Sequence, residues 1–212
     1  MLVVWGRKSS SNVQALMWCI GELGLPFVRH DIGHIYGGLD TDAFYDLNPN
    51  RTVPVLQDGG DPPLWETGAI LRFLANRYAG NGFWPADAVA RADVDRWAEW
   101  SKLNVALAFT GPVFWQVVRT PEKERDPAAI KSALRALEQK LLIAERPLDL
   151  HSFLVSDEIT LADIQFGHVL FRYYEIEIDR APLPNLKAYY ERLAKRPAFC
   201  EHVMIPYDDL RA

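Results

Sequence analysis

The stretch "TVPVLQD" (residues 52–58) has the apolar residues of a buried strand, yet it carries a proline. Proline cannot donate to a strand's hydrogen-bond ladder and is normally excluded from central strands. Two explanations remain open. Either the strand begins after Pro54, at a bend or an edge, or the Val53–Pro54 bond is cis and the strand starts in a turn whose backbone groups face outward.

The segments before this proline predict a strand–helix–strand unit followed by a short helix. The apolar runs "LVVW" (2–5) and "FVRHDI" (27–32) predict strands. Between them, a helix ending near Gly24 and Pro26 is predicted by four apolar residues at helical spacing: Val13, Leu16, Met17 and Ile20. A glycine-rich loop then leads to a short helix over 41–47.

The segments after the proline predict two strands, a helix and then helices only. A turn at 59–63 and the short strand "LW" precede a helix from Thr67. Further helices are expected over 86–118, 126–146, 160–174 and 185–196. The fold class is therefore α/β plus all-α, with a small α/β domain over 1–79 and an all-helical domain over 87–212.

The composition is that of an ordinary globular chain, since 49% of the 212 residues are hydrophobic and 24% are charged. The net charge of −5 argues against nucleic acid as a partner, and no apolar run approaches a membrane span. The first residues turn polar too early for a signal peptide. Cys19 and Cys200 form no CxxC pair, so we expect no metal, no disulfide framework and a cytoplasmic location.

Four blocks of the chain, in this order and at these distances, resemble those of cytosolic glutathione S-transferases with a serine-type active site. They are "NPNRTVPVL" (48–56), "LWETGAILRFLANRYA" (64–79), "ITLADI" (159–164) and "LPNLKAYYERLAKRPAF" (183–199). The resemblance covers essentially the whole chain. It implies a thioredoxin-like N-terminal domain that binds glutathione, a helical domain that shapes the second substrate's pocket, and a cis bond at Val53–Pro54.

The resemblance also implies how glutathione is held. Its ammonium group needs a carboxylate, which Glu66 supplies, although an acid near a helix start is often only a solvated charge. Its α-carboxylate needs donors, and the helix beginning at Thr67 offers unpaired N–H groups, although Thr67 also fits a simple helix cap. Val53, beside Pro54, would pair its backbone with the cysteinyl residue of glutathione.

The cation for the glycyl carboxylate is not defined by the sequence. Arg51, His34 and Lys8 are all candidates, and we favour Arg51, although each is more often a surface charge. Thr52 stands where the family often has a longer polar side chain, which weakens the expectation of one backbone-side contact.

Three consecutive serines follow the first predicted strand. Ser11 and Gln14 match a capping box, which explains one serine. A thiol has a pKa of about 8.5, so a hydroxyl beside a helix N-terminus would favour its anion. By resemblance to serine-type transferases, Ser10 is the first candidate for this role, Ser11 the second and Ser9 the third. No tyrosine or cysteine lies in this turn, which argues against the tyrosine and cysteine types.

Aromatic residues crowd the predicted helix over 86–118, which Gly111 and Pro112 should kink or split. They are Trp97, Trp100, Phe109, Phe114 and Trp115. Their spacing fits a core equally well as an apolar cleft for an electrophile. Thr160 and Asp163 form a capping signal, which we interpret as structural.

The leading hypothesis is an enzyme of detoxification type that transfers glutathione to a small apolar electrophile. Isomerase, dehalogenase or peroxidase use of the same thiolate stays open, and the alternative is a non-catalytic binding or interaction module. The family implies a homodimer. Opposite charges on two helices could steer the pairing, with Arg72 and Arg77 on one and Asp93, Asp95 and Glu99 on the other.

Overall fold

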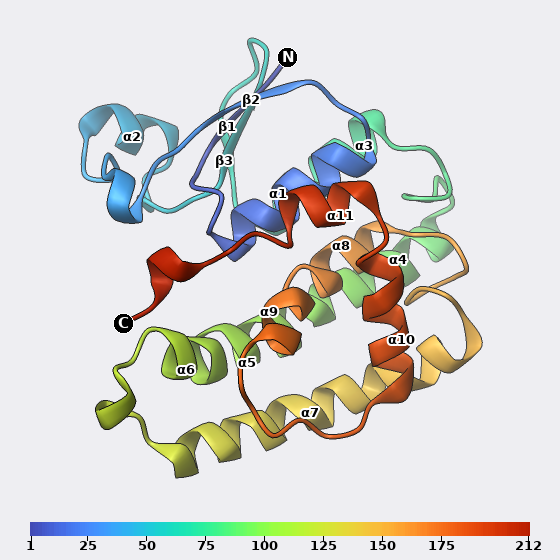
Figure 1. The fold of residues 1–212 in the computed structure, drawn as a ribbon. Helices are drawn as coiled ribbons and strands as arrows, with labels where there is room; N and C mark the ends of the chain where they lie inside the picture. The colour runs from blue at the N-terminus through green and yellow to red at the C-terminus, as the bar shows by residue number, and fades with distance from the viewer.

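The computed structural model describes all 212 residues. A four-stranded sheet and its helices form the upper layer in Figure 1, and a layer of helices lies below it. The sheet is built from β1 (Leu2–Trp5), β2 (Phe27–His30), β3 (Val55–Asp58) and β4 (Leu64–Trp65), in the order β2-β1-β3-β4. Strands β1 and β2 are parallel, whereas β3 is antiparallel to both β1 and β4.

Three helices belong to this upper layer, and the expected order of strands and helices is confirmed. Helix α1 spans Ser11–Glu22, α2 spans Asp42–Leu47 and α3 spans Thr67–Tyr78. Helices α1 and α3 pack against each other and turn toward the lower layer. The apolar stripe of α1 is fully enclosed, and Trp18 at its centre has no exposed surface. The small sheet is therefore attached to the helical layer through α1.

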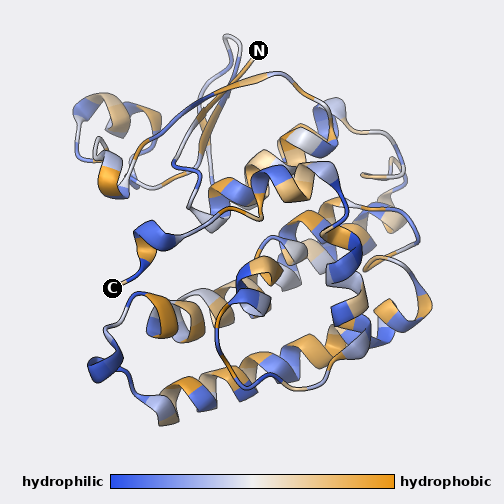
Figure 2. Ribbon diagram, in the orientation of Figure 1, coloured by the Kyte–Doolittle hydropathy of each residue, from blue (hydrophilic) through white to orange (hydrophobic).

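The lower layer is formed by one long bent helix and several shorter ones. After α4 (Ala88–Trp100), the helix continues through π-helical turns at Ser101–Ala106 and Thr110–Trp115, joined by α5 (Leu107–Phe109) and followed by α6 (Gln116–Val118). The remaining helices are α7 (Pro127–Leu150), α8 (Leu161–Gly167), α9 (Leu170–Glu175), α10 (Pro184–Leu193) and α11 (Pro197–His202). Figure 2 shows hydrophobic and hydrophilic residues alternating along α7, as expected for a helix with one face in the core.

One helix follows the sequence prediction in part and another differs from it. Gly111 and Pro112, expected to kink or split the long helix, do not split it and lie instead in the second π-helical turn, where the neighbouring Val113 and Phe114 are buried. The helix expected over 160–174 is instead interrupted at His168 and Val169, which divide it into α8 and α9. Thr160 and Asp163 do form the expected capping box.

The core is continuous across both layers, with one cluster of 47 buried hydrophobic residues. Trp100 packs near Phe166, and Trp18 makes an edge contact with Phe199 of α11. Both cysteines are free, Cys19 buried and Cys200 exposed. No helix combines the length and the apolar content that a membrane crossing requires.

Candidate functional site

Three loops meet at one end of the sheet because of the strand register. Trp5, the last residue of β1, lies opposite Val55, the first residue of β3, and Val55 lies opposite Trp65, the last residue of β4. The segments beyond these residues are the serine turn, the Val53–Pro54 peptide and Glu66. The sheet therefore brings together candidate residues that are up to 57 positions apart in the sequence.

The peptide bond between Val53 and Pro54 is cis, which confirms the expectation, and β3 begins directly after it at Val55. Gly6 lies against this peptide. A Cβ built on Gly6 would be 3.3 Å from Val53 Cβ and 2.5 Å from Val13 Cγ2, and its φ is +154°. Glycine is thus required where the turn after β1 passes between Val53 and α1.

The serine turn begins α1, but with a different capping arrangement from the one expected. Ser10 is the N-cap, Ser11 is the first helical residue, and no side chain caps the helix. The predicted capping box of Ser11 and Gln14 is wrong, because the helix begins one residue earlier than it requires. Gln14 is instead buried, and neither its Oε1 nor its Nε2 has a hydrogen-bond partner.

The three serines have different surroundings. Ser9 is 4% exposed, and its hydroxyl donates to Asp209 Oδ2 at 2.7 Å. Ser10 and Ser11 are half-buried and leave their hydroxyls without a partner in the chain, while the Ser10 carbonyl accepts a 2.8 Å bond from the Gln14 N–H. The Ser10 hydroxyl is therefore available at the positive end of a twelve-residue helix.

Glu66 and Thr67 lie at the start of α3. Glu66 is the N-cap residue and has a φ of +70°, a left-handed conformation that is uncommon for a residue with a long side chain and is often found at functional sites. Its carboxylate is 56% exposed and accepts a 3.1 Å hydrogen bond from Lys102 Nζ. Thr67 is the first residue of α3 and is buried. The carboxylate and the first-turn N–H groups thus lie beside each other.

The three cations considered for the glycyl carboxylate differ in what they bind. Arg51 Nη1 donates to the carbonyls of Leu39 and Thr41 at 2.9 and 3.0 Å, so one edge of its guanidinium holds the loop before α2. His34 Nε2 lies 2.9 Å from the Asp209 carbonyl oxygen. The Lys8 side chain is exposed and makes no ion pair.

The C-terminal segment reaches the serine turn, which the sequence did not indicate. Figure 1 shows this segment between the upper layer and α6. Asp209 of this segment contacts Ser9, and the Ala212 N–H donates to the Val118 carbonyl at 3.0 Å. Arg172 of α9 also holds the turn, because its Nη2 donates to the Ser9 carbonyl at 2.7 Å. The turn that carries Ser10 is therefore fixed from the helical layer.

Arg172 is a buried cation next to this turn. It is 3% exposed, and its guanidinium lies over the rings of Phe114 and Tyr207, at 4.8 and 5.7 Å. Burial lowers its pKa to about 10, and the charge of Arg7 adds to this effect, whereas Asp209 opposes it. Burial also lowers the pKa of Arg7, again opposed by Asp209. Two cations, Arg7 and Arg172, and one carboxylate, Asp209, thus lie next to the turn that carries Ser10.

The aromatic residues of the long helix fall into three groups by exposure. Phe109 and Phe114 are fully buried and belong to the core, whereas Trp115 is 46% exposed. Trp97 and Trp100 are partly buried and contact each other edge to face at 5.1 Å. Spacing could not separate these groups, because core and surface side chains follow the same helical period.

The charges expected to face a second subunit are instead paired within the chain. Arg72 Nε donates to Asp95 at 2.7 Å and Arg72 Nη2 to Glu99 at 2.6 Å. In addition, Arg77 pairs with Asp58 and Asp61, and Asp93 pairs with Arg96. The electrostatic argument for steering a dimer is therefore wrong, because α3 and α4 of one chain already face each other.

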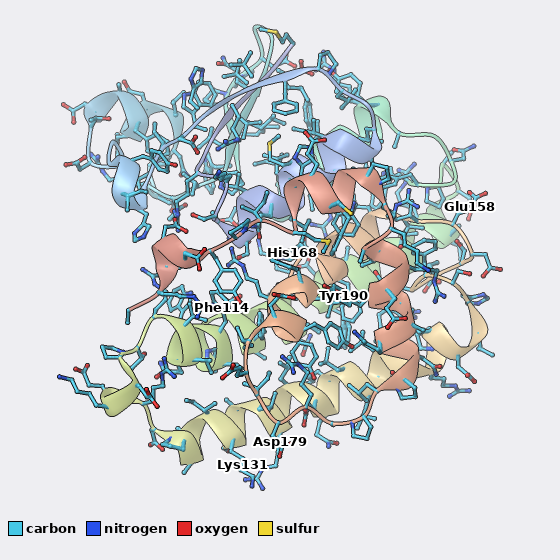
Figure 3. The ribbon with its side chains drawn as sticks, in the orientation of Figure 1. Phe114, Lys131, Glu158, His168, Asp179 and Tyr190 are labelled. Carbon is cyan, nitrogen blue, oxygen red and sulfur yellow. The ribbon has the colours of Figure 1, made fainter.

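A cavity of about 900 Å³ lies between the start of α7 and the loop before α10 and shares no residue with the serine turn, Pro54 or Glu66. Figure 3 labels Lys131 and Asp179 there, at the far end of the helical layer from α1. Its charged side chains include both signs. Because it contains none of the candidate residues, its size alone does not make it the reaction site. No cluster of three or more His, Cys, Asp or Glu side chains is placed to hold a metal ion.

Comparisons with known proteins match both parts of the chain. Residues 9–77 match the model of the glutathione S-transferase N-terminal domain, and residues 106–197 match that of the C-terminal domain. The chain is 33% identical over 208 residues to the glutathione S-transferase GstB of Escherichia coli, covering 97% of this chain and 99% of that protein. It is 31% identical to glutathione S-transferase 3 of Zea mays, covering 93% and 91%.

A solved structure is similar over nearly the whole chain. It is the theta class glutathione S-transferase of the citrus canker pathogen Xanthomonas axonopodis pv. citri with glutathione bound, with a TM-score of 0.90 and 40% identity. The alignment covers 97% of this chain and 98% of that structure.

Proposed function

Because the chain belongs to the glutathione S-transferase family and is a transferase with glutathione as its co-substrate, we propose that Ser10 stabilises the glutathione thiolate. The observation that carries this proposal is that Ser10 is the N-cap of α1 yet caps no N–H group with its side chain. Its hydroxyl can therefore donate to a thiolate at the positive helix end. Ser11, one residue further on, is the second candidate.

Ser9, the third candidate, fits the role less well. Its hydroxyl already donates to Asp209, and it has almost no exposed surface. The charges of Arg7 and Arg172 would lower the free energy of the thiolate further, whereas the charge of Asp209 would oppose them. In the reaction, the thiolate sulfur attacks the electrophile's carbon, and the leaving group departs with the bonding electrons.

The remaining proposed contacts would hold glutathione along one end of the sheet. Glu66 would bind the ammonium group, Thr67 and the first turn of α3 the α-carboxylate, and the backbone of Val53, fixed by Pro54, the cysteinyl residue. We assign Arg51 to the glycyl carboxylate. One side of its guanidinium holds the loop before α2, and the partly exposed remainder has N–H groups to donate.

The second substrate is proposed to be a small apolar electrophile. It would bind between the serine turn and the long helix, on which Trp115 has an exposed apolar ring. The two structural units proposed for this arrangement are 1–79, which holds glutathione, and 87–212, which shapes the electrophile pocket. The cytoplasmic location expected from cysteine usage stays a prediction.

A homodimer is also part of the proposal. The charged side chains of α3 and α4 are paired within the chain and do not support it. Apolar surface on the long helix does, because Leu103 and Leu107 are 54% and 60% exposed and lie one turn apart. In a dimer, the cleft beside Trp97 and Trp100 would complete the electrophile pocket.

The function is tested by two assays on the purified protein. We expect retention on immobilised glutathione and conjugation of a generic aryl halide that depends on glutathione. Retention without conjugation of any electrophile would support the non-catalytic alternative, whereas isomerisation, dehalogenation or peroxide reduction would redirect the assignment of the second substrate.

A further inference from the structure

The ion pair of Glu66 and Lys102 joins the two layers at the expected γ-glutamyl site. Lys102 Nζ lies 3.1 Å from Glu66 Oε2. Lys102 belongs to the π-helical turn at Ser101–Ala106, and such turns occur frequently at functional sites. The carboxylate proposed to receive the ammonium of glutathione thus already has a cation beside it.

The Lys102 side chain also passes over the first turn of α3. A Cβ built on Gly68, the second residue of α3, would lie 4.0 Å from Lys102 Cδ. The first turn of a helix carries N–H groups without intrahelical partners, which suit a carboxylate. Lys102 therefore reaches the helix end at which the α-carboxylate of glutathione is proposed to bind.

The neighbouring charges leave Lys102 free to change partners. Asp95 and Glu99, the acids of α4 on this side, are both held by Arg72. The only ion pair of Lys102 is the one with Glu66, and its side chain is 28% exposed. Its ammonium can therefore move to an incoming anion without abandoning a second acid.

We propose that Lys102 is a glutathione-binding residue that pairs with the α-carboxylate of the γ-glutamyl group, while Glu66 pairs with the ammonium on the same carbon. This inference rests on the proposed roles of Glu66 and Thr67. The ligand exchanges one ion pair of the protein for two, so neither Glu66 nor Lys102 is left unpaired on binding. Recognition of glutathione would thus require the helical layer of the same chain.

The test compares two ligands and three variants by calorimetry. The ligands are glutathione and 4-aminobutanoyl-Cys-Gly, which lacks only the α-carboxylate. Lys102→Met keeps the apolar stem and removes the charge, Lys102→Arg keeps the charge, and Lys140→Met is a matched control on the exposed face of α7. Thermal melting confirms that each variant is folded.

We expect Lys102→Met to weaken glutathione binding by about tenfold, as for loss of a charged hydrogen bond of about 1.4 kcal/mol. It should leave binding of the analogue unchanged within about twofold, and Lys102→Arg should recover most of the affinity for glutathione. The kcat at saturating glutathione should change little, because the thiol lies at the other end of the γ-glutamyl group.

Three results would overturn the inference. Unchanged glutathione affinity in Lys102→Met would make the pair a surface contact, and tighter binding would mean that Lys102 competes with the ammonium for Glu66. An equal loss for both ligands would mean that Lys102 only orients Glu66. In each case the wild-type protein still binds glutathione, whereas a wild type that fails to bind it would overturn the proposed function as well.

Discussion

The Ser9 hydroxyl donates a 2.7 Å hydrogen bond to the carboxylate of Asp209, 200 residues further along the chain. The Asp209 carbonyl oxygen meets His34 Nε2 at 2.9 Å, so one C-terminal residue contacts two loops of the upper layer. The turn that presents Ser10 is consequently held by residues from both ends of the sequence.

Asp209→Asn should lower the free energy of unfolding by about 1 kcal/mol. The change removes the negative charge that faces Arg7 and Arg172. The effect should fall below the range for a charged hydrogen bond, because Asp209 is exposed and water screens its charge. Urea unfolding measures it. Asp208→Asn is the control, since the 82% exposed Asp208 side chain pairs only with Arg211 and should have almost no effect.

Ser10→Ala should raise the pKa of the thiol of bound glutathione by about one unit or more and lower kcat near neutral pH about tenfold per unit. Glutathione affinity should change less, because the hydroxyl acts mainly on the charged form. Ultraviolet titration of the thiolate in the complex measures the pKa. If Ser11→Ala shifts it while Ser10→Ala titrates like wild type, the assignment is one residue out.

Glu66→Gln keeps the side chain's shape and removes the charge that faces the ligand's ammonium. We expect glutathione binding to weaken by about 1.5–3 kcal/mol, as for a charged hydrogen bond. Calorimetry measures the dissociation constant, with Glu122→Gln on the exposed turn before α7 as the control. An unchanged dissociation constant would exclude Glu66 as a ligand.

His168 should make the fold sensitive to acid. It is 1% exposed, and burial lowers its pKa from 6.5 to about 4, opposed by the backbone of Gln165 and Ile164 and assisted by the charges of Arg172 and Lys102. Figure 3 shows it in the interior, between α1 and the lower helices. Between these two pKa values the unfolded chain binds a proton that the folded chain does not, so stability falls as the pH falls.

His168→Gln removes this contribution and should reduce the stability lost between pH 6.5 and 4 by up to about 3 kcal/mol. Urea unfolding at a series of pH values compares the two proteins, so carboxylates common to both cancel. His151→Gln is the control, because His151 is exposed. Parallel pH profiles for wild type and His168→Gln would contradict the prediction.

The dimer predicts a mass of roughly twice 24.1 kDa by light scattering at micromolar concentration. Leu107→Lys places a charge on the proposed apolar contact and should shift the protein toward monomer. Leu150→Lys, at the end of α7 and 69% exposed in the wild type, should not. A wild-type monomer that still conjugates glutathione would refute both the dimer and any need for it in the site.

The sequence by itself determined the order of strands and helices, the helical second half, and the residues at the ends of three strands. These features follow from local rules: apolar spacing, turn residues and a proline that a central strand cannot contain. Pro54 was singled out by this local argument, whereas Glu66 and the serine turn became site candidates through the family resemblance, before the sheet register placed all three at one end. The cis peptide itself came from the family resemblance, since the residues alone left two explanations open.

Only the tertiary structure decided which polar side chains already have a partner within the chain. Ser9 is held by Asp209 and Arg72 by Asp95 and Glu99, while Lys102 reaches Glu66. Each contact joins segments that are far apart in the sequence and share no local pattern. The sequence alone therefore does not distinguish a free serine, arginine or lysine from a paired one. The availability of such a side chain depends on which segments the continuous core packs together, because burial and strand register, not spacing along the chain, bring distant side chains within hydrogen-bond distance.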